Sequence, residues 1–330
     1  MSTIANSVKP AGFMEAVRQA LDEAMAADES VVLLGEDVSD TEGGGVFGAS
    51  LGLSTKYGDR VRSTPIAEQA IMGAAIGAAL AGMRPVAEIM IMNFITVAMD
   101  QLCNHAAKLR YMSGGRTGVP ITVRTTGFGA GAAAQHSDLL EAWLCHVPGL
   151  KVVMPSDPFE AKGLLLSCIF DDDPCVVVES PLIGPPAVLA TPGERIPLGK
   201  ANIRRTGSDV TVIGYGSSIG RIDPVAATFD GEGLSVEVID LRTVSPLDMD
   251  TVLESVAKTR RAVVVHESVK NFGVGAEVSA GIHEALFSEL AAPVQRVAAP
   301  FVPVPFSPPL VDSYTYRPAD IEAAVRRTVE

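Results

Sequence analysis

Apolar residues near the start of the chain follow two different spacings. Phe13, Val17 and Leu21 recur at helical intervals, so the range 12–27 is predicted to form an amphipathic helix. Residues 31–35 (VVLLG) form one short apolar run, which is typical of a strand buried on both faces of a parallel sheet. A helix followed by such a strand is a building unit of α/β folds.

The same alternation continues through the first half of the chain. Thr64 and Pro65 have the residue types of a helix cap and a first helical position, and an almost entirely apolar helix is predicted from 65 to 83. Further strands are predicted at 84–91, 120–126, 150–155 and 175–180, and further helices at 94–112, at about 139–145 and at 157–170. Strands that alternate with helices predict a mostly parallel sheet covered by helices on both faces.

A stretch rich in proline and glycine, residues 181–208, interrupts this alternation and is interpreted as an interdomain connection. Beyond it, strands are predicted at 209–216, 235–243, 262–268 and 293–300, and helices at 219–229, 246–259, 274–290 and 318–329. The predicted organisation is therefore α/β with two domains, residues 1–190 and 208–330, joined by a linker at 191–207.

Composition narrows the class of protein. A formal net charge of −13 argues against nucleic acid or an anionic membrane as the main partner. The longest apolar run, 71–83, is shorter than the roughly 20 residues that a membrane span requires. The N-terminal residues show no signal peptide, and four scattered cysteines without a CxxC pair indicate reduced thiols. We expect a soluble, cytoplasmic protein.

Glu68 is the first candidate for chemistry, because it lies in the opening turn of the apolar helix predicted at 65–83. A glutamate there can simply complement the helix macrodipole, which contributes about 0.3–1 kcal/mol. Alternatively, a carboxylate in apolar surroundings can take part in proton transfer. The segment alone leaves both interpretations open.

A second candidate is the glycine-rich loop at 127–138, whose residues 127–132 fit the pattern GxGxxG/A of a dinucleotide site. That pattern also requires an acidic residue at the end of the next strand, and here none occurs before Asp157. The loop instead carries His136, Ser137 and Asp138. A substrate-facing loop at the end of a strand is the preferred interpretation.

A series of motifs, taken in chain order, matches one family over about residues 13–329. The motifs are GEDV with GGVFG, RSTPIAEQAIMGAAIGAALAGMRPVAE, NFITVAMDQLCNHAAKLRYMSGG, AAQHSDLLEAW, HVPGLKVVMPSDPFEAKGLL, DPCVVVE and VIDLRTVSPLD. The chain resembles the β subunit of the thiamine-diphosphate-dependent first component of 2-oxoacid dehydrogenase complexes, most closely the pyruvate and acetoin types. The resemblance implies a transketolase-like pyrimidine-binding domain followed by a transketolase C-terminal-like domain.

The resemblance also implies roles for individual residues. It places Glu68 against a pyrimidine nitrogen of the cofactor, where the carboxylate favours the tautomer that activates the thiazolium carbon. Phe94 would pack on the pyrimidine ring, and Ile66 and Met90 would form walls of that pocket. His136 would be the active-site proton donor. Branched-chain enzymes generally carry glutamine at the position of Met90, so methionine there favours a small substrate.

The family often binds a structural potassium ion through carbonyl oxygens. The positions that match are Ile121, Cys168, Ile169, Asp171 and Asp173. An acidic turn that merely ends a helix explains the same residues nearly as well, and both interpretations stay open.

The magnesium-diphosphate motif of thiamine enzymes begins with GDG, and this sequence contains no GDG. The resemblance therefore implies that an α subunit holds the diphosphate and Mg²⁺, that the cofactor is shared in an α₂β₂ heterotetramer, and that the acyl unit passes to a lipoyl-bearing acyltransferase core. Purified alone, the chain is expected to be inactive.

Three departures from the family leave the substrate open. Asp138 stands where glutamine is common, the segment SPLIGPP lacks the usual tyrosine, and the loop RTTGFGAG differs from both branches. The main hypothesis is a pyruvate or acetoin dehydrogenase subunit. The alternatives are a related subunit that loads another small acyl unit, and a mainly architectural subunit that docks the complex onto its core.

Overall fold

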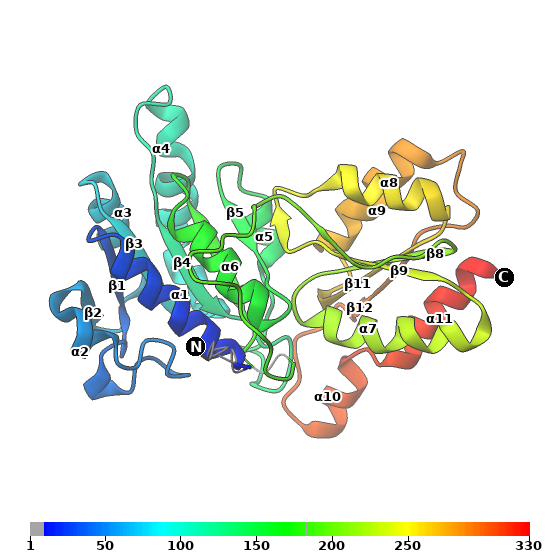
Figure 1. Cartoon of the computed structure of the whole chain (residues 1–330), viewed down its shortest axis with the longest axis horizontal. Coiled ribbons are helices and arrows are strands. Elements are labelled where there is room, and N and C mark those ends of the chain that lie inside the picture. Colours follow the sequence, from blue (N-terminus) through cyan, green and yellow to red (C-terminus); the bar gives the residue numbers. More distant parts are fainter. Residues whose placement is uncertain (1–9, 182–183) are drawn as a thin grey trace, which may run out of the picture.

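The computed structural model describes residues 10–181 and 184–330, which form two α/β domains side by side (Figure 1). Residues 1–9, on which the expectation about a signal peptide partly rests, and residues 182–183 of the proline-rich stretch lie outside the described residues. Each domain contains a mostly parallel sheet covered by helices, so the predicted fold class is confirmed.

The first domain is built on a seven-stranded sheet with the order β10-β5-β6-β4-β3-β1-β2. All neighbouring strands are parallel except β10 and β5. The strands are β1 (Val31–Glu36), β2 (Val61–Thr64), β3 (Arg84–Ile91), β4 (Thr122–Thr126), β5 (Lys151–Val153), β6 (Cys175–Glu179) and β10 (Thr243–Ser245). Their buried side chains are mainly valine, isoleucine and leucine, as the continuous apolar runs predicted.

Two groups of helices cover this sheet. α1 (Phe13–Ala27) and α6 (Pro158–Ile169) pack together over one face. α3 (Glu68–Leu80) and the segments that follow β3 contribute to a second apolar cluster. The remaining short elements of this domain are η1 (Asp40–Glu42), α2 (Leu53–Tyr57), η2 (Gly58–Arg60) and α5 (Glu141–Cys145).

The second domain contains a five-stranded sheet with the order β12-β11-β8-β9-β7, in which only β7 is antiparallel to its neighbour. Its strands are β7 (Asn202–Arg205), β8 (Val210–Gly214), β9 (Val236–Asp240), β11 (Ala262–Val269) and β12 (Gln295–Ala299). Its helical elements are η5 (Gly216–Ser218), α7 (Ile219–Thr228), η6 (Phe229–Glu232), α8 (Met249–Thr259), α9 (Val274–Leu286), α10 (Pro308–Tyr314) and α11 (Pro318–Val329). Figure 1 shows α8 and α9 on one side of this sheet and α7 and α11 on the other.

The chain crosses between the domains more than once. β7 lies inside the range 191–207 that was predicted as a linker, and it pairs with β9 of the second sheet. β10 follows β9 in sequence but joins β5 of the first sheet. One apolar cluster contains both Ile71 of the first domain and Val264 of the second. The two domains therefore share part of their core.

The start of α3 differs from the prediction. Thr64 is the last residue of β2, where it lies opposite Glu36 of β1, and the helix begins at Glu68 after Ala67. The predicted cap at Thr64 and Pro65 is wrong, because pairing with β1 extends this segment as a strand. Proline restricts the residue before it to the extended conformation, which is compatible with a strand end. Glu68 nevertheless lies in the first turn, as predicted.

The single helix predicted at 94–112 is also corrected. The structure divides this range into a 3₁₀ segment, η3 (Met92–Ala98), a π-helical segment, η4 (Gln101–Ala106), and α4 (Ala107–Met112). The apolar spacing does not distinguish these related helices, because all of them place residues three to five apart on one face.

Arg124 occupies the centre of the first sheet and is completely buried. Its guanidinium donates two hydrogen bonds to Glu179, at 2.7 and 2.9 Å, and one to Glu88 at 2.7 Å. Burial raises the pKa of Glu179, although the charge of Arg124 opposes this effect. The three side chains extend from the adjacent strands β3, β4 and β6 and form one ion-pair network.

Replacing Arg124 with methionine is expected to lower the free energy of unfolding by about 3–5 kcal/mol, because it leaves two buried carboxylates without a cation. Urea denaturation measures this change. Arg62→Met is the matched control, since Arg62 is exposed and donates only to the Asp59 carbonyl oxygen. If both variants lose equally little stability, Arg124 does not support the sheet.

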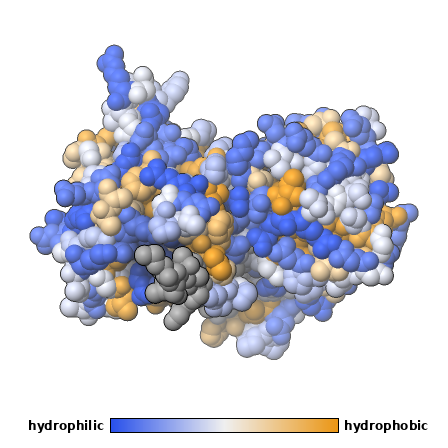
Figure 2. All heavy atoms as spheres, in the orientation of Figure 1, coloured by the Kyte–Doolittle hydropathy of each residue, from blue (hydrophilic) through white to orange (hydrophobic). Residues whose placement is uncertain are grey.

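Apolar side chains remain on the surface of both domains, including the boundary between them (Figure 2). Ile66, Leu80, Val97 and Met112 are exposed on the first domain, and Phe272 and Phe301 on the second. Exposed apolar surface of this kind often marks contact with another chain. Within residues 10–181 and 184–330, no helix is long and apolar enough to cross a membrane.

Candidate active site

The five residues predicted to form the pyrimidine pocket and its catalytic groups lie at or after the carboxyl ends of three parallel strands, β2, β3 and β4. Ile66 and Glu68 follow β2, Met90 is near the end of β3, Phe94 follows β3, and His136 follows β4. Together with β1, these strands form the part of the first sheet that has the order β4-β3-β1-β2. In α/β sheets, ligands bind at this edge.

Glu68 is the first residue of α3 and is half-buried. The helix has no side-chain cap, because Ala67 is the capping residue. A carboxylate at this position is favoured by the macrodipole, so that interpretation still holds for local stability. Glu36, at the end of β1, lies close enough that the charge of Glu68 contributes to its raised pKa, after burial and the charge of Asp37.

Phe94 and His136 are in contact although they are far apart in sequence. Their ring centroids are 5.4 Å apart, and the ring planes meet at 78° in an edge-to-face arrangement. Both side chains are half-buried, so each keeps an accessible face. An aromatic ring beside an imidazole supplies an apolar surface and a proton-transfer group at one location.

Met90 and Ile66 differ in exposure. Met90 is half-buried, and it lines a small cavity with Met14, Phe47 and Arg124. Ile66 is 75% exposed. Ile66, Glu68, Phe94 and His136 do not line this cavity.

The loop that carries His136 has no helix or strand between residues 127 and 140. α5 begins only at Glu141, so no helix starts at the glycines of the GxGxxG-like pattern. Gly127 is needed for packing, since a Cβ atom there would lie 2.5 Å from a methyl carbon of Leu139. The loop therefore does not have the geometry of a dinucleotide-binding turn.

The other histidines lie outside this group. His266, in β11, is completely buried, and burial lowers its pKa to about 4. Its Nδ1 atom is 3.0 Å from the hydroxyl oxygen of Ser268. His266 is therefore neutral and packed in the core of the second domain.

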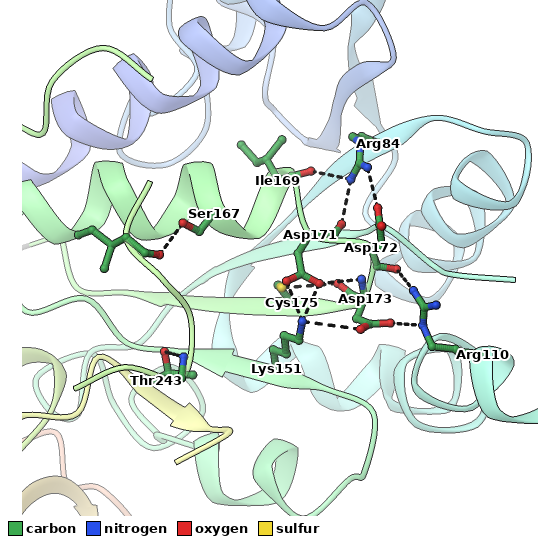
Figure 3. Close-up of polar contacts among 12 residues, drawn as sticks. Arg84, Arg110, Lys151, Ser167, Ile169, Asp171, Asp172, Asp173, Cys175 and Thr243 are labelled. Atoms are coloured by element: carbon green, nitrogen blue, oxygen red, sulfur yellow. Dashed lines mark hydrogen bonds and ion pairs between the residues drawn. The ribbon is translucent and has the colours of Figure 1, made fainter. Parts of the chain in front are cut away.

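The residues proposed for potassium surround the turn between α6 and β6 (Figure 3). Each carboxylate of this turn has a cationic partner. Lys151 donates to both oxygens of Asp171 at 2.7 Å, Arg84 pairs with Asp172 at 2.7 Å, and Arg110 pairs with Asp173. Three acidic side chains thus face three basic ones, and their formal charges cancel.

The carbonyl oxygens of the five proposed residues also have donors. Those of Ile169 and Asp171 accept from Arg84, and the other three accept from the amide of Cys175 (Ile121), the amide of Asp171 (Cys168) and the thiol of Cys175 (Asp173). No group of three His, Cys, Asp or Glu side chains in the described residues could hold a metal ion. The acidic side chains of the turn are thus neutralised by protein groups, whereas each proposed carbonyl oxygen has a second lone pair beyond the donor named here.

Because Lys151, Arg84 and Arg110 already neutralise the turn, replacing potassium with choline at constant ionic strength is expected to shift the melting temperature by less than about 2 °C. Such a shift corresponds to a free-energy change below about 1 kcal/mol. Sodium is the second comparison. If potassium alone raised the melting temperature by several degrees, the result would support a cation site at this turn.

Comparison with known proteins identifies the family. Residues 9–183 match the family described as transketolase, pyrimidine binding domain, and residues 199–321 match transketolase, C-terminal domain. The chain is 46% identical to the β subunit of an acetoin:2,6-dichlorophenolindophenol oxidoreductase from Cupriavidus necator, over 96% of each chain. It is 44% identical to the β subunit of the mitochondrial pyruvate dehydrogenase E1 component of Bos taurus, over 96% of this chain and 89% of the relative. The chain belongs to the β-subunit family of acetoin and 2-oxoacid dehydrogenases.

One further relative and one solved structure are also similar to this β subunit. It is 48% identical to the mitochondrial 2-oxoisovalerate dehydrogenase subunit β of Chaetomium thermophilum, over 91% of this chain and 65% of the relative. A solved structure described as a split-gene transketolase, an inactive β₄ tetramer, matches 97% of this chain and 99% of that one with a TM-score of 0.78 and 23% identity. The second likeness establishes the transketolase-like fold.

One residue of this β subunit was not singled out from the sequence. Asn93, directly before Phe94, bonds to Asp138 on the loop of His136. The position of Asn93 just after β3 could have identified it from the sequence, because polar residues at the carboxyl ends of parallel strands often contribute to binding or catalytic sites. Asp138 itself was noted only as a departure from the family.

Proposed function

We propose that this chain is the β subunit of a thiamine-diphosphate-dependent dehydrogenase of pyruvate or acetoin, and that it acts with an α subunit to transfer a two-carbon acyl unit to a lipoyl group. The names of the relatives from Cupriavidus necator and Bos taurus support these two substrates. The observation that carries the proposal is the grouping of Ile66, Glu68, Met90, Phe94 and His136 at one sheet edge.

The residues fit the pyrimidine half of thiamine diphosphate. Glu68 offers a half-buried carboxylate at the edge, and Phe94 offers an aromatic face beside apolar Met90 and Ile66. When bound, thiamine diphosphate would supply the nucleophilic carbon that the reaction at the substrate carbonyl requires. In this proposal Glu68 exchanges a proton with a ring nitrogen of the pyrimidine, and Phe94 keeps that ring in an apolar surrounding.

His136 would act on the substrate side of the same pocket. Its contact with Phe94 places the imidazole next to the surface proposed for the pyrimidine. An imidazole there can donate a proton to the oxygen of the substrate carbonyl as it is attacked, and can recover the proton when the acyl unit leaves.

The α subunit would complete the site. The chain lacks the GDG motif, so the diphosphate and Mg²⁺ are assigned to α. The high exposure of Ile66 agrees with a pocket that another chain covers. An α₂β₂ heterotetramer is the proposed assembly, with a lipoyl-bearing acyltransferase core as its further partner. Potassium is left out of this proposal, because the carboxylates of the turn at 171–173 are already paired with basic side chains.

A second candidate function is the loading of another small acyl unit. Asp138 differs from the residue common in the family and borders the large cleft between the domains. The identity to a 2-oxoisovalerate dehydrogenase subunit is as high as that to the acetoin enzyme, although it covers less of the relative. Met90, in place of the glutamine of branched-chain enzymes, favours the smaller substrates.

The test is an assay of the co-expressed αβ pair with pyruvate, acetoin and branched 2-oxoacids, using dichlorophenolindophenol as electron acceptor. Reduction that depends on thiamine diphosphate and on pyruvate or acetoin supports the proposal. Higher kcat/KM for a branched 2-oxoacid would favour the second candidate. An assembled pair that is inactive with all of them would contradict both and leave an architectural role.

A further inference from the structure

A reciprocal hydrogen-bonded pair joins the two segments that carry Phe94 and His136. The amide nitrogen Nδ2 of Asn93 donates to Oδ2 of Asp138 at 2.8 Å, and the backbone N–H of Asp138 donates to Oδ1 of Asn93 at 3.2 Å. The backbone donor requires an oxygen on that side of Asn93, so the orientation of the amide follows from the pair itself.

The pair lies next to both rings of the proposed site. Asn93 directly precedes Phe94, and Asp138 lies two residues after His136. The amide of Asn93 also reaches the carbonyl oxygen of Ala134 at 3.5 Å. The distance between the rings, 5.4 Å, therefore depends on where Asn93 holds the loop.

A second bond closes the loop around His136. The backbone N–H of Ala132 donates to the hydroxyl oxygen of Ser137 at 2.9 Å, and Ser137 is buried. Since residues 127–140 contain no helix or strand, the loop depends on such side-chain contacts for its shape. Ser137 fixes the loop internally, whereas Asp138 fixes it to the segment of Phe94.

We propose that Asp138 is a positioning residue, which acts through Asn93 to hold the imidazole of His136 against Phe94. The inference rests on the proposed function for its catalytic consequence. A hydrogen bond to a carboxylate is shorter and stronger than one between neutral groups, so aspartate makes the pair rigid. The longer glutamine common at this position in the family would place its oxygen about one carbon–carbon bond further from the backbone and so require a different spacing from Asn93.

The expected catalytic effect follows from the sensitivity of proton transfer to geometry. A displacement of about 1 Å can cost about 10²-fold in rate. Because Asp138 does not need to touch the substrate, its loss should lower kcat without a matching change in the affinity for thiamine diphosphate.

A double-mutant cycle in the αβ pair tests the proposal. Asn93→Asp places two carboxylates opposite each other, and we expect kcat to fall at least ~10-fold, with cofactor affinity within ~2-fold of the wild type. Asp138→Asn leaves a side-chain oxygen that can still accept, and should retain activity within ~3-fold. The double variant Asn93→Asp with Asp138→Asn exchanges donor and acceptor and rebuilds both bonds, so kcat should recover to within ~3-fold of the wild type. The melting temperatures of all four proteins identify any loss that is only a loss of folding.

A measurement on the full chain that needs no activity separates this inference from the proposed function. In the NMR spectrum of histidine-labelled protein, the imidazole signal of His136 is the one that disappears in His136→Ala. The chemical shift of this signal should change in Asn93→Asp and should return to its wild-type value in the double variant. An unchanged signal and kcat in Asn93→Asp, or a double variant no better than Asn93→Asp, would overturn the positioning role. If the wild-type pair has no dehydrogenase activity while the signal behaves as expected, the proposed function fails and the positioning role stands.

Discussion

Replacing Glu68 with glutamine is expected to lower kcat of the reconstituted αβ enzyme by ~10²–10⁴-fold, the scale on which a positioned acid–base group contributes. The amide has nearly the same shape, but it cannot exchange a proton with a pyrimidine nitrogen. The loss should therefore appear in kcat more than in the affinity for the substrate. Steady-state kinetics at saturating cofactor measure both quantities.

The variant also distinguishes the two interpretations of Glu68. Glutamine lacks the charge that complements the macrodipole of α3, so a purely local role predicts a loss of about 0.3–1 kcal/mol in stability and normal turnover. Gln69→Ala is the matched control, because the exposed side chain of Gln69 is next in the same helix. Near-normal kcat in Glu68→Gln would leave only the local role.

Replacing His136 with alanine is expected to slow the chemical or acyl-transfer step by at least ~100-fold. The imidazole is proposed on the substrate side of Phe94, so the affinity for thiamine diphosphate should change little. Single-turnover measurements with a lipoyl acceptor separate the two steps. His105→Ala is the control, since His105 lies on η4 with more than half of its side chain exposed. Turnover equal to that of the control would make His136 a structural residue of the loop.

The parts of the fold that could be predicted are those with a strong local signal. Continuous apolar runs such as 31–35 and 262–265 lie in strands of the two sheets, because a strand covered on both faces has no polar side. The same alternation places Met90, Phe94 and His136 at the carboxyl edge, since all parallel strands point the same way. The prediction that Glu68 lies in the first turn of α3 was correct, although the helix begins at Glu68 and not at residue 65.

The parts that could not be predicted depend on contacts between distant segments. β2 and β10 are short strands, and each becomes a strand by pairing with a neighbour from another part of the chain. The change from 3₁₀ to π to α geometry between 92 and 112 follows from packing and not from apolar spacing. The bond between Asn93 and Asp138 requires the path of an irregular loop, which no periodicity describes.

The five residues proposed for potassium illustrate a different limit of prediction from sequence. The resemblance supplies the positions, but it does not show which donors the carbonyl oxygens already have. Lys151, Arg84 and Arg110 come from β5, β3 and α4, and only the fold brings them to the turn at 171–173 (Figure 3). Their three charges neutralise the turn.

The central claim is that this chain contributes half of a shared cofactor site. Calorimetric titration of the purified chain with thiamine diphosphate and magnesium tests it most directly. The chain alone should show weak or no binding and no oxoacid decarboxylation, because its sequence has no GDG motif to hold the diphosphate and Mg²⁺. The same titration of the αβ pair should show tight, stoichiometric binding. Tight binding by the isolated chain, or decarboxylation without a partner, would mean that it carries a complete site and would contradict the account.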